Sequence, residues 1–327
     1  MKPKVLVTQW IPDAVNDAFK NELDLVYPSK EKTSYSYSKV VKIIGEFDAL
    51  LTIFNKADKA IINAGVNLKA IANLGVGYDS IEVEYATTKN IAVINSPTSV
   101  TESTAELAIG LIMASMRNIV AYDKSMRKGE WTSTAFEDKA VEVFGHTLGI
   151  AGFGRIGKSV CKKAQVLGMK VAYYDPFPLN PDDEKEMNVE FMPLEKLFAQ
   201  CDCVSLHMPY TSENHHLVDE RLLSTMKKGS FLINVARGPI VKESALVEAL
   251  NNGTLKGSAL DVYEFEPKIS KELLACENVV LNPHVGTQTM QVRINMCNES
   301  LNGVLQALKG ETPYNLVNKD INMKSRF

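Results

Sequence analysis

The sequence predicts an α/β protein with two doubly wound domains, each built on a parallel sheet. Short apolar runs alternate with helical patterns along nearly the whole chain, and this alternation is typical of parallel sheets. The chain has 327 residues, which at about 100–200 residues per domain suffice for two domains. A glycine-rich turn from Gly152 to Gly157 opens the second series of strands.

The first hundred residues alternate regularly between expected strands and helices. The strands are expected at 5–8, 23–27, 49–53, 69–74 and 91–94, and the helices at 14–21, 39–45, 58–64 and 80–89. The fourth strand runs into Gly75-Val76-Gly77, at a strand's carboxyl end, where open α/β sheets bind ligands. No lysine-bearing phosphate helix follows, so the turn's N–H groups suit a small anion such as a carboxylate; an ordinary tight turn fits the pattern equally well.

A long helical pattern and a second series of strands follow. The helix is expected at 101–118, as a connector between domains, and the stretch 125–143 is expected to be irregular. Strands are then predicted at 148–151, 171–174, 202–207, 230–235, 257–262 and 279–281, and helices at 155–167, 194–200, 219–226 and 242–251. The second sheet is complete by residue 281, so we expect the last helix, 290–309, to return to the first domain. The predicted domains are 1–100 with 288–327, and 101–287.

The sequence Gly152-Phe-Gly154-Arg-Ile-Gly157 joins an apolar strand to a helix. Gly152 permits the tight turn, Gly154 lets the backbone approach a pyrophosphate, and Gly157 lets the helix lie close to the sheet. The next strand ends at Asp175, about 20 residues later, where a carboxylate binds the hydroxyls of an adenosine ribose. Asp175 would repel a ribose 2′-phosphate, so the pattern favours NAD over NADP. A site for S-adenosylmethionine uses a similar loop and acid, and this alternative stays open here.

Three charged residues, Arg237, Glu266 and His284, each follow a strand of this second sheet, at the edge that carries the glycine turn. Beside a nicotinamide they suit reversible hydride transfer to a 2-oxo acid. Arg237 can hold the carboxylate and polarise the carbonyl, and His284 can protonate the alkoxide. Glu266 can stabilise the charged imidazole and fix its ring. Each residue alone also suits a structural role, and His207, which ends a strand too, is a rival acid.

The composition argues against several other classes of protein. A net charge of −3 gives no reason to expect nucleic acid or an anionic membrane surface, and no apolar run is long enough to span a membrane. We do not expect the first residues to act as a signal peptide, because their apolar run is short. Five cysteines without a CxxC pattern are expected to be reduced thiols that bind no metal. We therefore expect a cytoplasmic protein.

These motifs resemble those of the D-isomer-specific 2-hydroxyacid dehydrogenases over nearly the full chain. The matching stretches are LGVGYD at 74–79, GIAGFGRIG at 149–157, HMP at 207–209, NVARG at 234–238, ALDVYEFEP at 259–267 and PHVG at 283–286. The resemblance implies a Rossmann NAD-binding domain inserted in a flavodoxin-like substrate domain, and a homodimer. It favours NAD over S-adenosylmethionine as the ligand of the glycine turn.

The resemblance also implies roles for single residues. The implied catalytic set is Arg237, Glu266 and His284, and the implied substrate-binding groups are Arg237 and the backbone of Val76 and Gly77. The implied cofactor-binding residues are Thr104, Gly152, Gly154, Arg155, Ile156, Gly157, Asp175, Met208, Val235, Ala236, Asp261 and Gly286.

The substrate is expected to be a small or modestly apolar 2-oxo acid, of the glyoxylate, hydroxypyruvate or branched-chain type. Phosphoglycerate-oxidising members carry a basic and a small polar residue where this chain has Thr52-Ile-Phe-Asn55, and Phe54 and Tyr78 suit an apolar substrate better. The alternatives are a phosphoglycerate dehydrogenase-like enzyme and an NADH-sensing binding protein that resembles a corepressor.

Overall fold

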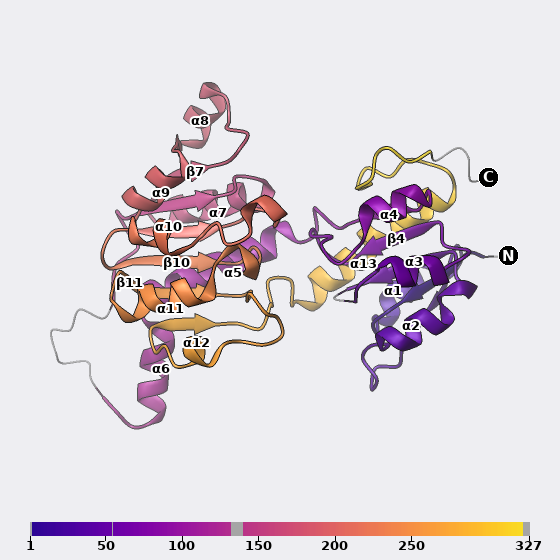
Figure 1. The fold of residues 1–327 in the computed structure, drawn as a ribbon, viewed down its shortest axis with the longest axis horizontal. Helices are drawn as coiled ribbons and strands as arrows, with labels where there is room; N and C mark the ends of the chain where they lie inside the picture. Colours follow the sequence, from indigo (N-terminus) through magenta and orange to yellow (C-terminus); the bar gives the residue numbers. More distant parts are fainter. Residues whose placement is uncertain (1, 54, 132–139, 323–327) are drawn as a thin grey trace. The chain divides into compact units, whose positions relative to one another are not determined.

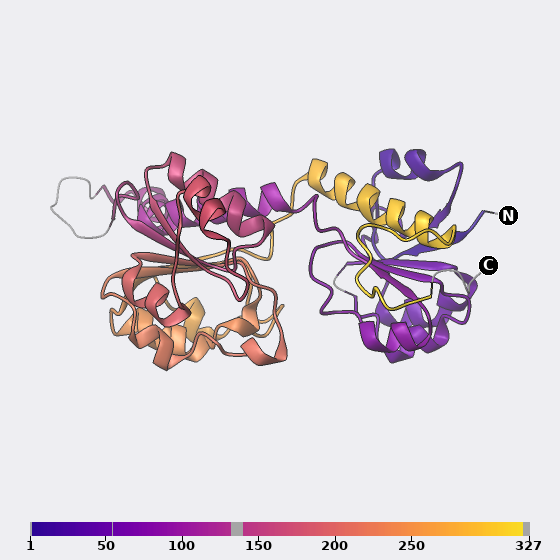
Figure 2. The ribbon, with the colours of Figure 1, turned by 90° about the horizontal axis from the view of Figure 1, so that it is seen from above.

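The computed structural model describes residues 2–53, 55–131 and 140–322. The chain divides into two compact units: Met1–Val100 with Thr287–Phe327, and Thr101–Gly286. Each unit contains one parallel sheet with helices on both faces (Figures 1 and 2). The predicted fold class of two doubly wound parallel sheets is therefore confirmed.

The first unit has a five-stranded sheet in the order β2-β1-β3-β4-β5, which is the flavodoxin-like order. Its strands are β1 (Lys4–Val7), β2 (Asp24–Val26), β3 (Ala49–Thr52), β4 (Ala70–Asn73) and β5 (Ala92–Ile94). Nearly every residue of β1, β3, β4 and β5 is buried, because apolar helices cover both faces of the sheet.

Two helices from opposite ends of the sequence cover one face of this sheet, and three helices cover the other (Figure 2). On the first face lie α1 (Asp13–Phe19) and α13 (Met290–Leu308). On the other lie α2 (Tyr37–Ile43), the 3-10 turn η1 (Ile44–Glu46), α3 (Lys59–Ala64) and α4 (Val83–Thr88). The last helix thus packs on the first unit's sheet, as expected.

The segment beyond α13 is bonded to β5 through Asn318. The Asn318 side chain accepts the N–H of Val93 at 2.8 Å and donates to the carbonyl of Ile91 at 2.9 Å. The Asn318 side chain thereby takes the place of a neighbouring strand beside β5. Residues 323–327 lie outside the described part of the chain.

The second unit has a seven-stranded sheet in the order β12-β11-β10-β9-β6-β7-β8. Its strands are β6 (Thr147–Ala151), β7 (Lys170–Tyr174), β8 (Glu190–Phe191), β9 (Cys203–Leu206), β10 (Ser230–Asn234), β11 (Leu255–Leu260) and β12 (Val279–Leu281). The chain starts in the middle at β6, winds outward to β8 and then returns to β9 on the other side. This is the Rossmann order, and ligands bind where the winding reverses, at the carboxyl ends of β6 and β9.

Helices cover both faces of the second sheet as well. One face carries α5 (Thr101–Met116) and α7 (Arg155–Val166). The other carries α9 (Leu194–Gln200), α10 (Glu220–Ser224), η3 (Gly238–Ile240), α11 (Glu243–Asn251) and α12 (Lys271–Leu274). The 3-10 turn η2 (Ser212–Asn214) lies in the loop after β9 and buries none of its residues. Cys161, Cys201, Cys203 and Cys297 are buried, Cys276 is partly exposed, and all five are free thiols.

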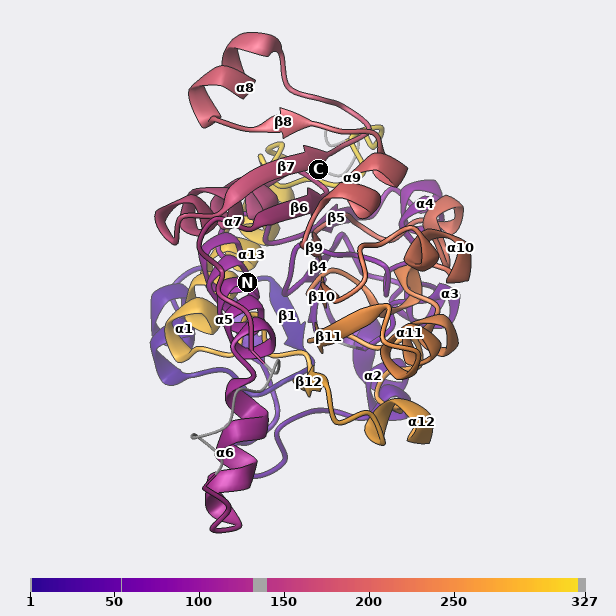
Figure 3. The same ribbon diagram turned by 90° about the vertical axis from the view of Figure 1, so that its left-hand side faces the viewer.

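The helices α8 and α6 lie outside the predicted helix ranges (Figure 3), and only the last residues of α6 enter the stretch 125–143 that was expected to be irregular. The helix α8 (Pro181–Met187) begins with a proline, which is favourable in a first helical turn, and Asn180 caps it by accepting the N–H of Asp183. The helix α6 (Ile119–Arg127) follows Asn118, whose φ of 55° breaks the direction of α5, and it buries none of its residues.

No single helix in the described ranges is long and apolar enough to cross a membrane. The helices α5 and α6 meet the length and composition test only as a pair, bent by 63° at their break.

Candidate active site

The glycine turn between β6 and α7 has the geometry that its sequence predicts. Gly152 has a φ of 97°, and a Cβ there would lie 2.5 Å from the backbone nitrogen of Met208. A Cβ at Gly157 would lie 2.2 Å from the carbonyl oxygen of Gly152, whereas a Cβ at Gly154 would contact nothing within 4 Å. Gly154 is the N-cap of α7 and has no side chain that could cap its first turn. An open space beside Gly154 and an uncapped helix N-terminus together fit a pyrophosphate.

Asp175 lies beside this turn, at the end of β7. Its Oδ2 accepts the N–H of Phe153 at 2.7 Å, and its Oδ1 accepts the N–H of Phe177 at 2.9 Å. Each carboxylate oxygen can accept more than one hydrogen bond, so both can still bind ribose hydroxyls. The two backbone bonds fix the carboxylate next to the glycines, and the residues present therefore fit an adenine dinucleotide.

The other predicted cofactor contacts lie at the same edge of the sheet. Arg155 and Ile156 open α7, and the backbone of Met208 packs against Gly152. A Cβ at Gly286 would lie 3.5 Å from Thr104 Oγ1. Val235 and Ala236 directly follow β10 and are buried.

His284 and Glu266 form an ion pair just past β12 and β11. His284 Nδ1 lies 3.0 Å from Glu266 Oε2, and each side chain is 35% exposed. Burial raises the pKa of Glu266, but the hydrogen bond and charge of His284 outweigh it, with smaller contributions from the Tyr263 N–H and Arg237. The net effect lowers the pKa of Glu266 below its ordinary value, so the carboxylate stays ionised beside the imidazole.

The loop that carries His284 is anchored by Asp261. His284 has a φ of 53°, in the left-handed region that non-glycine residues seldom adopt. Asp261 accepts the next two N–H groups, that of Val285 at 2.7 Å and that of Gly286 at 2.9 Å. Burial raises the pKa of Asp261, and these backbone bonds partly oppose that rise. The family resemblance implies that Asp261 contacts the cofactor, and what the structure shows is this anchoring of the loop.

Arg237 follows β10 and is held by a buried asparagine. Asn234 accepts the N–H of Ala236 at 3.0 Å and donates to the carbonyl of Arg237 at 3.0 Å. The positive charge of Arg237 contributes to the lowered pKa of Glu266, after the larger effects of burial and His284. The fold therefore brings Arg237, Glu266 and His284 to one sheet edge within electrostatic reach of one another.

His207, the rival acid, is in a different environment. Its Nε2 lies 2.8 Å from Ser205 Oγ, and its Nδ1 is buried with no hydrogen-bond partner among the described residues. Burial lowers the pKa of His207 to about 3. A neutral imidazole of this kind cannot supply a proton near neutral pH, so His284 is the better candidate acid.

The turn at Val76 and Gly77 in the first unit presents its N–H groups as donors. The carbonyl of Val76 accepts from Asn95 Nδ2 at 2.8 Å, and the carbonyl of Gly77 accepts from Asn73 Nδ2. Among the described residues, neither N–H donates a hydrogen bond. Such a pair of backbone donors suits a carboxylate. Phe54, which we also expected near the substrate, lies outside the described residues.

Sequence reasoning did not identify the residues that support these groups. Asn73 and Asn234 are the last residues of β4 and β10, and Asn95 directly follows β5. The sequence did contain one signal for them, an asparagine at or just after the carboxyl end of a strand. The amide of such a residue can form hydrogen bonds with the backbone of the following loop.

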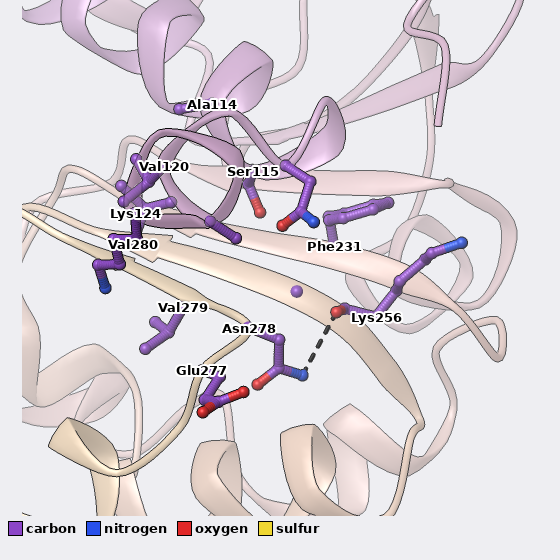
Figure 4. A pocket seen from close by; sticks show the side chains of 13 residues that line it. Ala114, Ser115, Val120, Lys124, Phe231, Lys256, Glu277, Asn278, Val279 and Val280 are labelled. Carbon is purple, nitrogen blue, oxygen red and sulfur yellow. Dashed lines mark hydrogen bonds between the residues drawn. The ribbon is translucent and has the colours of Figure 1, made fainter. Parts of the chain in front are cut away.

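A hollow on the second unit lies at the opposite edge of the sheet (Figure 4). Phe231, Lys256 and Val279, which line it, stand at or near the first residue of β10, β11 and β12, whereas the charged set follows the last residues. This hollow is therefore separate from the candidate site. In the described ranges, no three His, Cys, Asp or Glu side chains could hold a metal ion together.

Comparisons with known proteins agree with this geometry. Residues 109–286 match the model of the D-isomer specific 2-hydroxyacid dehydrogenase NAD binding domain. The chain is 38% identical to a glyoxylate reductase of Pyrococcus horikoshii, over 98% of this chain and 97% of the relative. It is also 38% identical to a glyoxylate reductase of Thermococcus litoralis, over 98% of each.

Solved structures agree with the sequence comparisons. A glyoxylate reductase from Paecilomyes thermophila superposes with a TM-score of 0.86 at 30% identity, over 97% of this chain and 99% of that one. An NADPH-dependent glyoxylate/hydroxypyruvate reductase from Sinorhizobium meliloti has a TM-score of 0.86 at 28% identity, over 98% of each chain. With its full-length relatives, its matched domain model and both of its sheets in the expected order, the chain belongs to the D-isomer-specific 2-hydroxyacid dehydrogenase family.

Proposed function

We propose that this protein is an NAD-dependent oxidoreductase that interconverts 2-hydroxy and 2-oxo acids and works mainly as a 2-oxo acid reductase. The observation that carries the proposal is the His284–Glu266 pair, which lies near Arg237 at the sheet edge that also carries the glycine turn and Asp175. Family membership supports the same reaction class.

The three side chains have complementary tasks in the reduction. A reduced nicotinamide, when bound at the glycine turn, would supply a hydride for the carbonyl carbon. Arg237 pairs with the substrate carboxylate and polarises the carbonyl oxygen. His284 transfers a proton from Nε2 to that oxygen, and Glu266, bonded to Nδ1, keeps the ring oriented and stabilises its charged form. Acid catalysis of this kind accelerates a reaction by about 10²–10⁴-fold.

We propose NADH rather than NADPH as the preferred reductant. The support is Asp175, whose carboxylate is fixed beside the glycine turn by two backbone N–H groups and would face a ribose 2′-phosphate with like charge. The similar Sinorhizobium meliloti enzyme is NADPH-dependent. The preference for NADH is therefore proposed on the basis of Asp175 and not of this comparison.

We propose a small 2-oxo acid of the glyoxylate or hydroxypyruvate type as the substrate. The support is that several similar proteins are glyoxylate reductases. The first unit is then the substrate domain, in which the N–H groups of Val76 and Gly77 bind the carboxylate, and 101–287 is the NAD-binding domain.

We further propose a homodimer in the cytoplasm. The support for a dimer is α6, which buries none of its residues and exposes half of the surface of both Ile119 and Met126, with Tyr122 between them on the same side. The support for a reducing compartment is that all five cysteines are free. Sedimentation at several concentrations tests the dimer, and a species that stays monomeric would contradict it.

A panel of 2-oxo acids with NADH tests the main proposal. We expect loss of nicotinamide absorbance with glyoxylate or hydroxypyruvate, and a much slower rate with 3-phosphohydroxypyruvate. Failure to oxidise NADH with any member of the panel would contradict the proposal. If the same preparation bound a protein partner only when NADH was present, the corepressor-like alternative would replace it.

A further inference from the structure

Two glutamates behind the candidate site bind each other's backbone. Glu243 opens α11 and is only 4% exposed. Its Oε1 accepts the N–H of Glu264 at 2.9 Å, and its Oε2 accepts the hydroxyl of Ser270 at 2.9 Å. In return, Glu264 Oε2 accepts the N–H of Glu243 at 2.8 Å. The start of α11 is thereby tied to the turn that contains Glu266.

The burial of the Glu243 carboxylate is energetically unfavourable unless its hydrogen bonds compensate for the lost hydration. A buried carboxylate loses several kcal/mol of hydration, which only hydrogen bonds or an opposite charge can offset. In the described chain Glu243 pairs with no lysine or arginine, and its partners are one N–H and one hydroxyl. Lys242 provides no side-chain cap for α11, so Glu264 supplies the acceptor that the helix N-terminus requires.

His216 joins the pair to the segment that follows Arg237. Its Nε2 lies 2.8 Å from Glu264 Oε1, and its backbone N–H donates to the carbonyl of Pro239 at 2.9 Å. Its ring stacks on His215 with the centroids 3.9 Å apart. His216 therefore connects Glu264, which its ring contacts, to η3, which its backbone N–H contacts. The turn η3 begins directly after Arg237.

The backbone at Tyr263 and Glu264 controls the direction of Glu266. Two successive N–H groups are used: that of Tyr263 donates to Glu266 Oε1 at 3.0 Å, and that of Glu264 donates to Glu243. Gly238 packs on the same peptide, because a Cβ at Gly238 would lie 1.8 Å from the Tyr263 carbonyl oxygen. The Tyr263 N–H belongs to the preceding peptide group of the same turn, so a displacement of this turn would shift the donor that holds Glu266 Oε1.

We propose that Glu243, Glu264 and His216 are positioning residues, which hold Glu266 against His284 and hold the segment after Arg237. The proposal rests on the reductase function argued above and goes beyond it. Misplacement of a reacting group by about 1 Å costs on the order of a hundredfold in rate. We call these three residues the clamp. The clamp therefore affects kcat through the position of Glu266 and not by contact with substrate or cofactor.

The test is a double-mutant cycle between Glu243 and Glu266, measured on the full chain with NADH and glyoxylate. We expect E243A to lower kcat by about tenfold to a hundredfold while the Kd for NADH stays unchanged. We expect E243Q to restore most of kcat, because its amide oxygen can still accept the Glu264 N–H. E248A, on the exposed side of the same helix, is the matched control and should keep the wild-type kcat.

The cycle separates positioning from simple loss of stability. In an E266Q background, E243A should cause little further loss of kcat, because the group through which Glu243 acts is already neutralised. Equal losses in both backgrounds, or an unchanged kcat in E243A, would overturn the proposal. If E243A does not fold, E264A takes its place in the same cycle, since Glu264 is less deeply buried. An inactive wild type overturns both this inference and the proposed function, whereas an active wild type with an unaffected E243A overturns this inference alone.

Discussion

Replacement of His207 by glutamine should change how the stability of the second unit depends on pH. Burial lowers the pKa of His207 from 6.5 to about 3 in the folded protein. Between these two values the unfolded chain binds a proton that the folded chain does not bind. Stability therefore falls as the pH falls below 6.5, and it is unaffected by this group well above 6.5.

The size of the effect follows from the two pKa values. Between the two pKa values, each pH unit changes the free energy of unfolding by about 1.4 kcal/mol. Near pH 6.5 the change per unit is smaller, because the histidine of the unfolded chain is only half protonated there. From pH 7 to pH 5 the wild type should lose about 2 kcal/mol of unfolding free energy through His207. H207Q has no such group, and its side chain can still bond Ser205 Oγ as His207 Nε2 does.

Urea unfolding followed by far-ultraviolet circular dichroism at a series of pH values measures the difference. The free energy of unfolding of the wild type should fall by about 2 kcal/mol more than that of H207Q between pH 7 and pH 5. Between pH 7.5 and 8.5 the difference between the two proteins should be constant, which serves as an internal control. Parallel curves over the whole range would refute the view that the His207 ring, whose Nδ1 is buried, is neutral in the folded protein.

Three further predictions concern catalysis, cofactor choice and thiol reactivity. H284A should lower kcat by about 10²–10⁴-fold with little change in the Kd for NADH, and equal losses in both would contradict its role as the acid. D175A should raise the ratio of kcat/KM for NADPH to that for NADH by about tenfold or more, because the like charge facing the 2′-phosphate is removed; an unchanged ratio in steady-state assays would count against Asp175. Iodoacetamide at pH 8 should modify only Cys276 in the native chain, since the other four thiols are buried and burial raises the pKa of Cys161 to about 11 and that of Cys201 and Cys297 to about 12. Mass spectrometry that showed rapid labelling of a second thiol would contradict this.

The sheet architecture could be predicted because local patterns determine it. Strands buried on both faces appear as short apolar runs, and a glycine such as Gly152, with a φ of 97°, has few substitutes. The position of a residue after a strand also placed Arg237 and His284 at one edge, since parallel strands all end on the same side.

The supporting contacts could not be predicted, because they join residues that are far apart in the sequence. Glu243 and Glu264 are 21 residues apart, and the bond from His216 to Glu264 spans 48 residues. Nothing in the spacing of a glutamate and a histidine indicates such a pairing. The helix α6 was missed for a related reason: it buries no residue within the described chain, so its apolar side chains were not recognised as one helical face.

The place of α13 has a consequence for the order of assembly during synthesis. The second unit is one continuous stretch, so it can fold once residue 286 has left the ribosome. The first unit begins earlier, yet one face of its sheet stays only partly covered until residue 308 has emerged, because α1 and α13 share that face. The part of this face that α13 covers, which includes β4, therefore completes its packing only after most of the chain has been synthesised.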